Sequence, residues 1–302
     1  MPFRITSILV ASDLSPGASH VLRSAAALAE LAEAELHVAH VVESNGLLEP
    51  DFASVEVANI ALREQLDAAL PASARATSVR VEGGRPHRVI LDLADEVRAD
   101  LIVVGPHRGA TPAPQVLGTT ADRLARTSEV PLLIIHGPIS LPLRSVLIPT
   151  DLSDAAEGAL DVGLIWTAAL RHPRGSDTQT VVHMLLAVPP VPDERAGEPR
   201  HTASARELHR HVEEACERTG CGPSLKIEEE VAEGDATELI LKRAKERAAD
   251  LVVLGTHGHG ALARALIGSV SSAVARRAEC PVLLVPPRYW QERREREERL
   301  RR

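Results

Sequence analysis

The chain has 302 residues, of which 44% are hydrophobic and 25% charged, a composition typical of a soluble protein with room for two globular domains. Its formal net charge of -8 provides no basic surface for nucleic acid or an anionic membrane, and an aromatic content of 2% leaves few side chains on which bases could stack. Residues 1–15 lack the pattern of a signal peptide, no run of about 18 apolar residues occurs, and the 3 cysteines form no Cys-x-x-Cys pair. We therefore predict a cytoplasmic protein that binds neither nucleic acid nor a membrane.

The two halves of the chain repeat one sequence pattern. The segment "SILVASDLS" that begins at residue 7 returns as "SVLIPTDLS" at residue 145, and "RADLIVVG" at residue 98 returns as "AADLVVLG" at residue 248. A repeat of this length indicates a duplicated domain rather than a solenoid unit. We expect a first domain over residues 1–140, a second over 141–288, and a charged tail over 289–302.

Short apolar segments rich in β-branched residues alternate with segments of helical periodicity in the first half. The expected strands cover residues 5–11, 35–42, 76–83, 99–105 and 130–136, and the expected helices cover 19–33, 57–70, 86–98 and 120–127. In the second half, Pro- and Gly-rich stretches at 171–178 and 189–204 are expected to be surface loops. Alternating strands and helices form a parallel sheet with both faces covered. We therefore predict an α/β protein with two tandem, doubly wound, five-stranded parallel sheets.

Candidate binding residues stand where the apolar strands end. Ligands of open parallel α/β sheets bind at the carboxyl ends of the strands. Asp13 and Asp151 follow the first strand of each half, and Gly105 and Gly255 follow the fourth. The second half continues with the spaced pattern Gly255-x2-Gly258-x9-Gly268-Ser269. Glycines allow close approach of the backbone and a helix N-terminus offers free N–H groups to an anion, so this pattern favours a phosphate-bearing ligand.

This glycine spacing resembles that of the universal stress protein family, as do the "LVASDLS" and "LIPTDLS" openings and the "CPVLLVP" close. The resemblance covers both halves and implies the Rossmann-like, adenine nucleotide alpha hydrolase-like fold. It also implies binding of ATP, ADP or AMP, with or without Mg²⁺, by a stress-response sensor or regulator. In the second half it implies that Asp151 contacts adenosine, that Ala187 lines the adenine pocket, and that Gly255, Gly258, Gly268, Ser269 and Val270 hold ribose and phosphates. The matching residues of the first half are Asp13, Val41, Gly105, Gly118 and Thr119.

The first half departs from the family pattern in its glycine loop. Arg108 stands where the second half has Gly258, and Pro112 and Pro114 follow it. A side chain at this position can block the approach of the backbone, although a guanidinium can also pair with phosphate. We therefore expect nucleotide binding mainly through the second domain. The family resemblance further implies paired domains within the chain and a homo-oligomer.

Several alternatives compete with this interpretation. The glycines can simply turn the chain while Ser269 caps a helix, and Asp13 and Asp151 can be turn or N-cap residues. The chain would then be a nucleotide-free scaffold for a protein partner. A slow ATPase is the other alternative, but no residue set beyond the two aspartates suggests an activated water.

Two weaker signals point to other ligands. The segment from Gly258 to Ala263 fits a permissive dinucleotide fingerprint, but it lies late in its domain and the first half does not repeat it. The histidine pairs His257 with His259 and His209 with His211 could chelate a metal, yet no Cys or carboxylate cluster completes a ligand set. We assign no catalytic residue and no metal site.

Overall fold

The computed structural model describes residues 5–44, 51–71, 74, 76–106, 117–171, 179–190, 197–221, 225–256, 267–287 and 289. The chain divides into two compact units, one within residues 4–139 and the other mainly within residues 140–302. These units are the first and the second domain.

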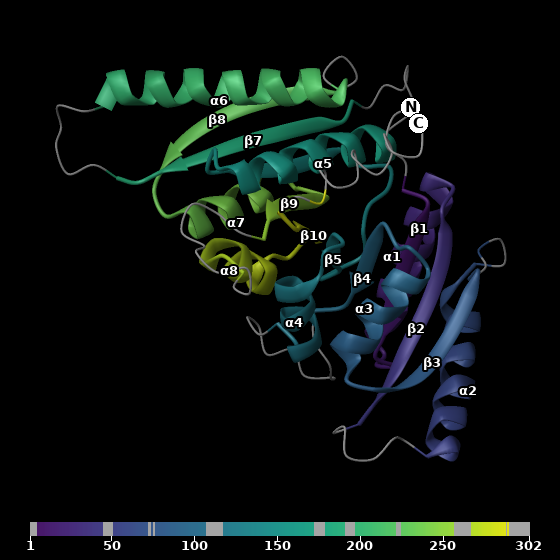
Figure 1. Cartoon of the computed structure of the whole chain (residues 1–302). Coiled ribbons are helices and arrows are strands. Elements are labelled where there is room, and N and C mark those ends of the chain that lie inside the picture. The colour runs from purple at the N-terminus through teal and green to yellow at the C-terminus, as the bar shows by residue number, and fades with distance from the viewer. Residues whose placement is uncertain are drawn as a thin grey trace, which may run out of the picture. The chain divides into compact units, whose positions relative to one another are not determined.

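The first domain contains a five-stranded parallel sheet with the strand order β3-β2-β1-β4-β5 (Figure 1). Its elements are β1 (Ser7–Ser12), α1 (Ala18–Ala32), β2 (Glu35–Glu43), α2 (Phe52–Ala69), β3 (Ser78–Gly84), α3 (Pro86–Glu96), β4 (Leu101–Val104), α4 (Thr119–Thr127) and β5 (Leu132–Ile134). Helix α1 packs against α2, and α3 against α4. Right-handed crossovers place the members of each pair on one face of the sheet, so both faces are covered.

The second domain repeats this arrangement with the strand order β8-β7-β6-β9-β10. Its elements are β6 (Ser145–Thr150), α5 (Asp154–Leu170), β7 (Val181–Val188), α6 (Gly197–Thr219), β8 (Lys226–Glu233), α7 (Ala236–Glu246), β9 (Leu251–Gly255), α8 (Ser269–Arg277) and β10 (Val282–Val285). Helix α5 packs against α6, and α7 against α8. The prediction of two tandem, doubly wound parallel sheets is confirmed.

The strand register shows which residues of the two domains correspond. Ser12 at the end of β1 lies opposite His40 of β2, and Thr150 at the end of β6 lies opposite Leu186 of β7. The next residues, Val41 and Ala187, are therefore equivalent. The aspartates that precede β4 and β9 also match, because Asp100 accepts the Ser7 N–H at 3.2 Å and Asp250 accepts the Ser145 N–H at 3.0 Å.

Two expectations about element boundaries are wrong. Helix α2 begins at Phe52 rather than at residue 57, because Asp51 caps it by accepting the Ser54 N–H at 2.7 Å. Helix α6 begins at Gly197, within the stretch 189–204 that was expected to be a loop. Pro199 does not prevent this, since the N–H groups of a first helical turn have no intrahelical partner.

The two helices that follow the first strand of each domain differ in burial. Helix α1 buries one face, whereas the residues of α5 from Ala159 to Thr167 are all buried. Asp161 lies in this run and is only 3% exposed. The guanidinium of Arg218 on α6 donates two hydrogen bonds to its carboxylate, at 2.9 and 3.1 Å, and so offsets the cost of burying this charge. Position 23 of the first domain, the counterpart of Asp161, carries an exposed arginine.

Candidate functional site

The turn after the first strand has the same geometry in both domains. Leu14 and Leu152 have positive φ angles of 60° and 62°, which an L-residue adopts at a cost of roughly 1 kcal/mol or more. Each is held by the hydroxyl two residues before it, since the Leu14 N–H donates to Ser12 and the Leu152 N–H to Thr150, both at 3.0 Å. Such local strain is concentrated at functional sites in proteins, and here it fixes the aspartate that follows each strand.

Asp13 and Asp151 shape these turns but do not cap the helices. Oδ1 of Asp13 accepts the N–H of Ser15 at 3.0 Å, and Oδ1 of Asp151 accepts the N–H of Ser153 at 3.1 Å. The N-cap of α5 is Ser153, and the N-cap of α1 is Gly17. Both aspartates therefore hold a turn and neither is an N-cap, while their contact with a ligand stays a prediction. Oδ1 of Asp13 alone serves its turn, whereas Oδ1 of Asp151 also accepts the hydroxyl of Ser153.

Glycines Gly118 and Gly268 close the glycine loops and start the next helices. The Gly118 N–H donates to the carbonyl of Pro106 at 2.6 Å, and the Gly268 N–H donates to that of Thr256 at 2.7 Å. Each glycine is the N-cap of its helix, α4 or α8, and neither makes a side-chain capping bond. Ser269 is thus the first residue of α8 and not its cap. Among the described residues no side chain accepts the first N–H groups of either helix, an arrangement that favours an anionic ligand.

The first domain contains a cavity of about 230 Å³ at the carboxyl ends of its strands. The five residues that the sequence assigned to the first-domain site all line it: Asp13, Val41, Gly105, Gly118 and Thr119. They come from β2, from the start of α4 and from the residues directly after β1 and β4, which are far apart in the chain. Residues 107–116, which include Arg108, Pro112 and Pro114, lie outside the described residues. The expectation that these three residues weaken nucleotide binding by the first domain therefore stays a prediction.

Two histidines that the sequence analysis missed also line this cavity. His20 belongs to the first turn of α1, and His136 follows β5. The signal for His20 was available, because it lies only one helical turn beyond the loop that contains Asp13. His136 was the harder of the two to find, since only the strand order brings the end of β5 to this site.

The second-domain residues occupy the equivalent places. Asp151 follows β6, Ala187 lies near the end of β7, and Gly255 ends β9. Gly268, Ser269 and Val270 form the start of α8. A side-chain hydrogen bond joins α8 to the end of β9, because the hydroxyl of Ser271 donates to the carbonyl of Gly255 at 2.6 Å. The first domain has Ala121 at the position of Ser271 and cannot form this bond. Gly258 lies outside the described residues.

The helix starts beside the two sites differ in charge. The first turn of α1 contains no acidic residue and has His20, whereas the first turn of α5 contains Asp154 and Glu157. Glu157 is paired with Arg218 at 2.9 Å, while Asp154 is exposed. Negative side chains stabilise a helix N-terminus by themselves and compete with an anionic ligand for it. The start of α1 therefore offers an anion a more favourable surrounding than the start of α5.

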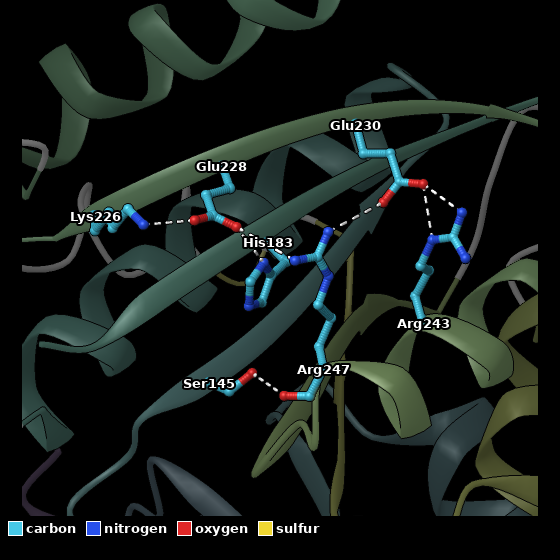
Figure 2. A network of polar contacts seen from close by, with 7 residues as sticks. All are labelled: Ser145, His183, Lys226, Glu228, Glu230, Arg243 and Arg247. Atoms are coloured by element: carbon cyan, nitrogen blue, oxygen red, sulfur yellow. Dashed lines mark hydrogen bonds and ion pairs between the residues drawn. The ribbon is translucent and has the colours of Figure 1, made fainter.

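A separate polar network lies on one face of the second-domain sheet, between β7, β8 and α7 (Figure 2). Glu230 accepts hydrogen bonds from Arg243, and Glu228 accepts one from Lys226 at 2.6 Å and lies 3.6 Å from Arg247. His183 is 3.2 Å from Glu228, and burial together with Arg247 lowers the pKa of its imidazole. Three cationic side chains thus share two carboxylates in Figure 2, and the contacts of Arg243 and Arg247 with them hold the C-terminal end of α7 to the sheet.

Other reactive side chains form no recognisable centre. Within the described ranges, no group of three or more His, Cys, Asp or Glu residues could hold a metal ion. His209 pairs instead with Glu213 and Glu229, and His257 and His259 lie outside the described residues. Burial raises the pKa of the Cys280 thiol to about 11, so this cysteine is a poor nucleophile at neutral pH. Among the described helices, none is long and apolar enough to span a membrane.

The duplicated parallel sheets and the strand-end glycines define a tandem protein of the Rossmann-like α/β class. A model of the universal stress protein family matches residues 4–136 and, a second time, residues 142–286. The chain therefore belongs to the universal stress protein family and contains its domain twice.

Individual relatives agree with this assignment. The chain is 30% identical over 209 residues to a universal stress protein of Mycolicibacterium smegmatis. This match covers 67% of this chain and 66% of that relative. It is 26% identical over 294 residues to a universal stress protein of Mycobacterium bovis, with 92% and 97% of the two chains covered. The crystal structure of a universal stress protein from Archaeoglobus fulgidus superposes with a TM-score of 0.67 at 20% identity, covering 94% of this chain and 100% of that one, and so supports the fold.

Proposed function

We propose that this chain binds an adenine nucleotide at the carboxyl ends of the strands in each domain and acts as a nucleotide-dependent regulator in a stress response. The observation that carries the proposal is the first-domain cavity, which brings together Asp13, Val41, Gly105, Gly118 and Thr119 from four separate elements. Sites of this kind, at the strand ends of doubly wound sheets, commonly hold nucleotides.

The residues present suit the parts of such a ligand. Val41 is buried and gives an apolar wall for the adenine ring. The carboxylate of Asp13 has an oxygen left over from the turn and can accept a hydrogen bond from a ribose hydroxyl. The start of α4 lines the same cavity, and its first helical N–H, that of Thr119, can donate to phosphate. ATP, ADP and AMP share these features, and Mg²⁺ would accompany a polyphosphate.

Nucleotide binding predominantly by the second domain stays a prediction of the sequence. It depends on Gly258, which permits close approach of the backbone where the first domain has Arg108. We do not extend the proposal to rapid hydrolysis, because no contact among the described residues singles out a base for an attacking water. Assembly into a homo-oligomer is a further expectation, to be tested by light scattering.

The proposal is tested by asking which ligand the purified protein retains. Denaturing the full chain and analysing the released small molecules by mass spectrometry should yield an adenine nucleotide at a substantial fraction of the protein concentration. The Asp13→Ala and Asp151→Ala double variant, purified in parallel, should retain much less. Retention of equal amounts by both proteins would point to carry-over rather than to binding at these sites.

A nucleotide-free scaffold is the second candidate function, and one observation favours it. Helix α2 exposes three apolar side chains, Phe52 at 84%, Val57 at 67% and Ile60 at 52%. Exposed apolar groups that lie together on one helix are typical of contact surfaces. A chain that retains no nucleotide and shows no heat on titration with ATP would favour this function over the first.

A further inference from the structure

The first-domain cavity has two imidazole side chains that the second domain lacks. Matching the domains on Asp13 and Asp151 places Gly158 at the position of His20. Matching β5 and β10 through their pairing with β4 and β9 places Pro286 at the position of His136. The two sites therefore share their turns and glycines but not the side chains around them.

His20 stands at a helix start that is prepared for an anion. Gly17, the N-cap of α1, makes no side-chain capping bond, the first turn has no acidic residue, and both Gly17 and His20 line the cavity. The start of α4 at Gly118 lines the same cavity and is also uncapped. The Ala18 N–H donates to the carbonyl of Ser15 at 3.0 Å, and the Gly118 N–H donates to that of Pro106 at 2.6 Å. Two helix N-termini still meet one cavity, and their partial positive charges favour a negatively charged group there.

The ring of His20 has hydrogen-bonding capacity that the described part of the chain does not use. Its Nε2 atom is buried and has no hydrogen-bond partner among the described residues. An unsatisfied buried nitrogen is unfavourable, and a ligand that supplies the missing partner removes this penalty. The χ2 torsion of histidine is broad, so the ring can turn a nitrogen toward the cavity without movement of the backbone.

We propose that His20 hydrogen-bonds directly to a phosphate group of the nucleotide in the first-domain cavity, beside the start of α1. This inference rests on the proposed function and adds a ligand contact that the second domain cannot make, because Gly158 has no side chain there. In the proposed complex Asp13, which lines the same cavity, binds the adenosine part of the ligand instead. The first site therefore distinguishes AMP from adenosine through His20.

The test compares AMP with adenosine on the full-length protein. A Gly268→Val background confines binding to the first domain, and isothermal titration calorimetry gives both affinities. Replacing His20 with alanine should weaken AMP binding about tenfold or more, the usual effect of losing a hydrogen bond to a charged group, and change adenosine binding less than about twofold. His20→Gln, whose amide can donate a similar hydrogen bond, should recover part of the AMP affinity. His87→Ala, a half-buried histidine at the start of α3, is the matched control and should leave both affinities unchanged.

Each outcome separates this inference from the function on which it rests. An equal loss of AMP and adenosine affinity in His20→Ala, or no loss of either, would overturn the contact with phosphate while nucleotide binding stands. Absence of binding by both ligands in the parent protein would overturn first-domain binding itself, and with it the role of His20. Retained adenosine binding in His20→Ala also shows that the variant is folded.

Discussion

The two domains share the geometry of their strand ends and differ in what surrounds it. The turns at Leu14 and Leu152 have nearly the same φ angle, and both aspartates hold the N–H two residues ahead. The helix that follows each turn begins differently. The first turn of α1 contains His20 and no acidic residue, whereas the first turn of α5 contains Asp154 and Glu157. Duplication has thus kept the backbone that positions a ligand, while the charge around that backbone has diverged. We expect the two sites to bind related ligands with different preferences.

Among the variants that distinguish the two domains, Gly268→Val should have the largest effect, on ATP binding. Gly268 has φ -58° and ψ 147°, a conformation open to any residue, so valine does not strain the backbone. Its branched side chain would instead occupy the space beside the uncapped start of α8, and ATP binding by the second domain should be abolished. Calorimetry on the full chain should show the loss of one site. Unchanged affinity and stoichiometry in the folded variant would refute the role of this glycine.

Removing Arg218 should reveal a difference in stability between the domains. Arg218→Ala leaves the buried Asp161 without its guanidinium, and we expect the free energy of unfolding to fall by about 2–3 kcal/mol at neutral pH. Arg23→Ala, at the exposed first-domain position equivalent to Asp161, is the control and should change it by less than about 0.5 kcal/mol. Urea unfolding followed by circular dichroism measures both.

The loss in Arg218→Ala should also depend on pH. Burial raises the pKa of Asp161 above its ordinary value, and Arg218 opposes this rise. A carboxyl with a raised pKa in the folded state favours folding at low pH, and this contribution is lost as the pH rises through the folded pKa. Without Arg218 the pKa rises further, so the destabilisation should be larger at pH 7 than at about pH 4. A loss that is the same at both pH values would show that Asp161 does not depend on its partner.

A smaller effect is expected from Asp151→Asn. Asparagine keeps an oxygen that can accept the Ser153 N–H, so the turn persists while the charge is removed. ATP affinity of the second site should fall about ten- to hundredfold, or roughly 1.5–3 kcal/mol. Asp67→Asn, an exposed aspartate on α2, serves as control. ATP turnover measured at saturating nucleotide should change little. A rate that collapses while binding persists would make Asp151 a catalytic or metal-positioning carboxylate and the protein an ATPase.

Local patterns predicted the parts of the site that depend on strand ends. Asp13 and Gly105 were found because each follows an apolar strand, and parallel strands bring their carboxyl ends to one edge of the sheet. The start of α2 was missed because residues 52–56 add nothing to its buried stripe, which begins at Ala58.

Contacts between distant elements could not be predicted in the same way. The apolar surroundings of Asp161 in the sequence indicate a buried charge that needs a partner. They do not identify Arg218, which lies 57 residues further along the chain. His136 joins the site only through the order of the strands, so no local pattern marks it as a lining residue.

The central claim, that the strand ends of both domains bind an adenine nucleotide, is tested most directly by titrating the full chain with ATP in a calorimeter. The wild-type protein should bind two nucleotides per chain, Gly118→Val and Gly268→Val should each bind one, and the variant with both changes should bind none while unfolding at a similar temperature. Binding that survives in the folded double variant would place the nucleotide elsewhere. Absence of binding in the wild type, checked to be free of retained ligand, would contradict the account altogether.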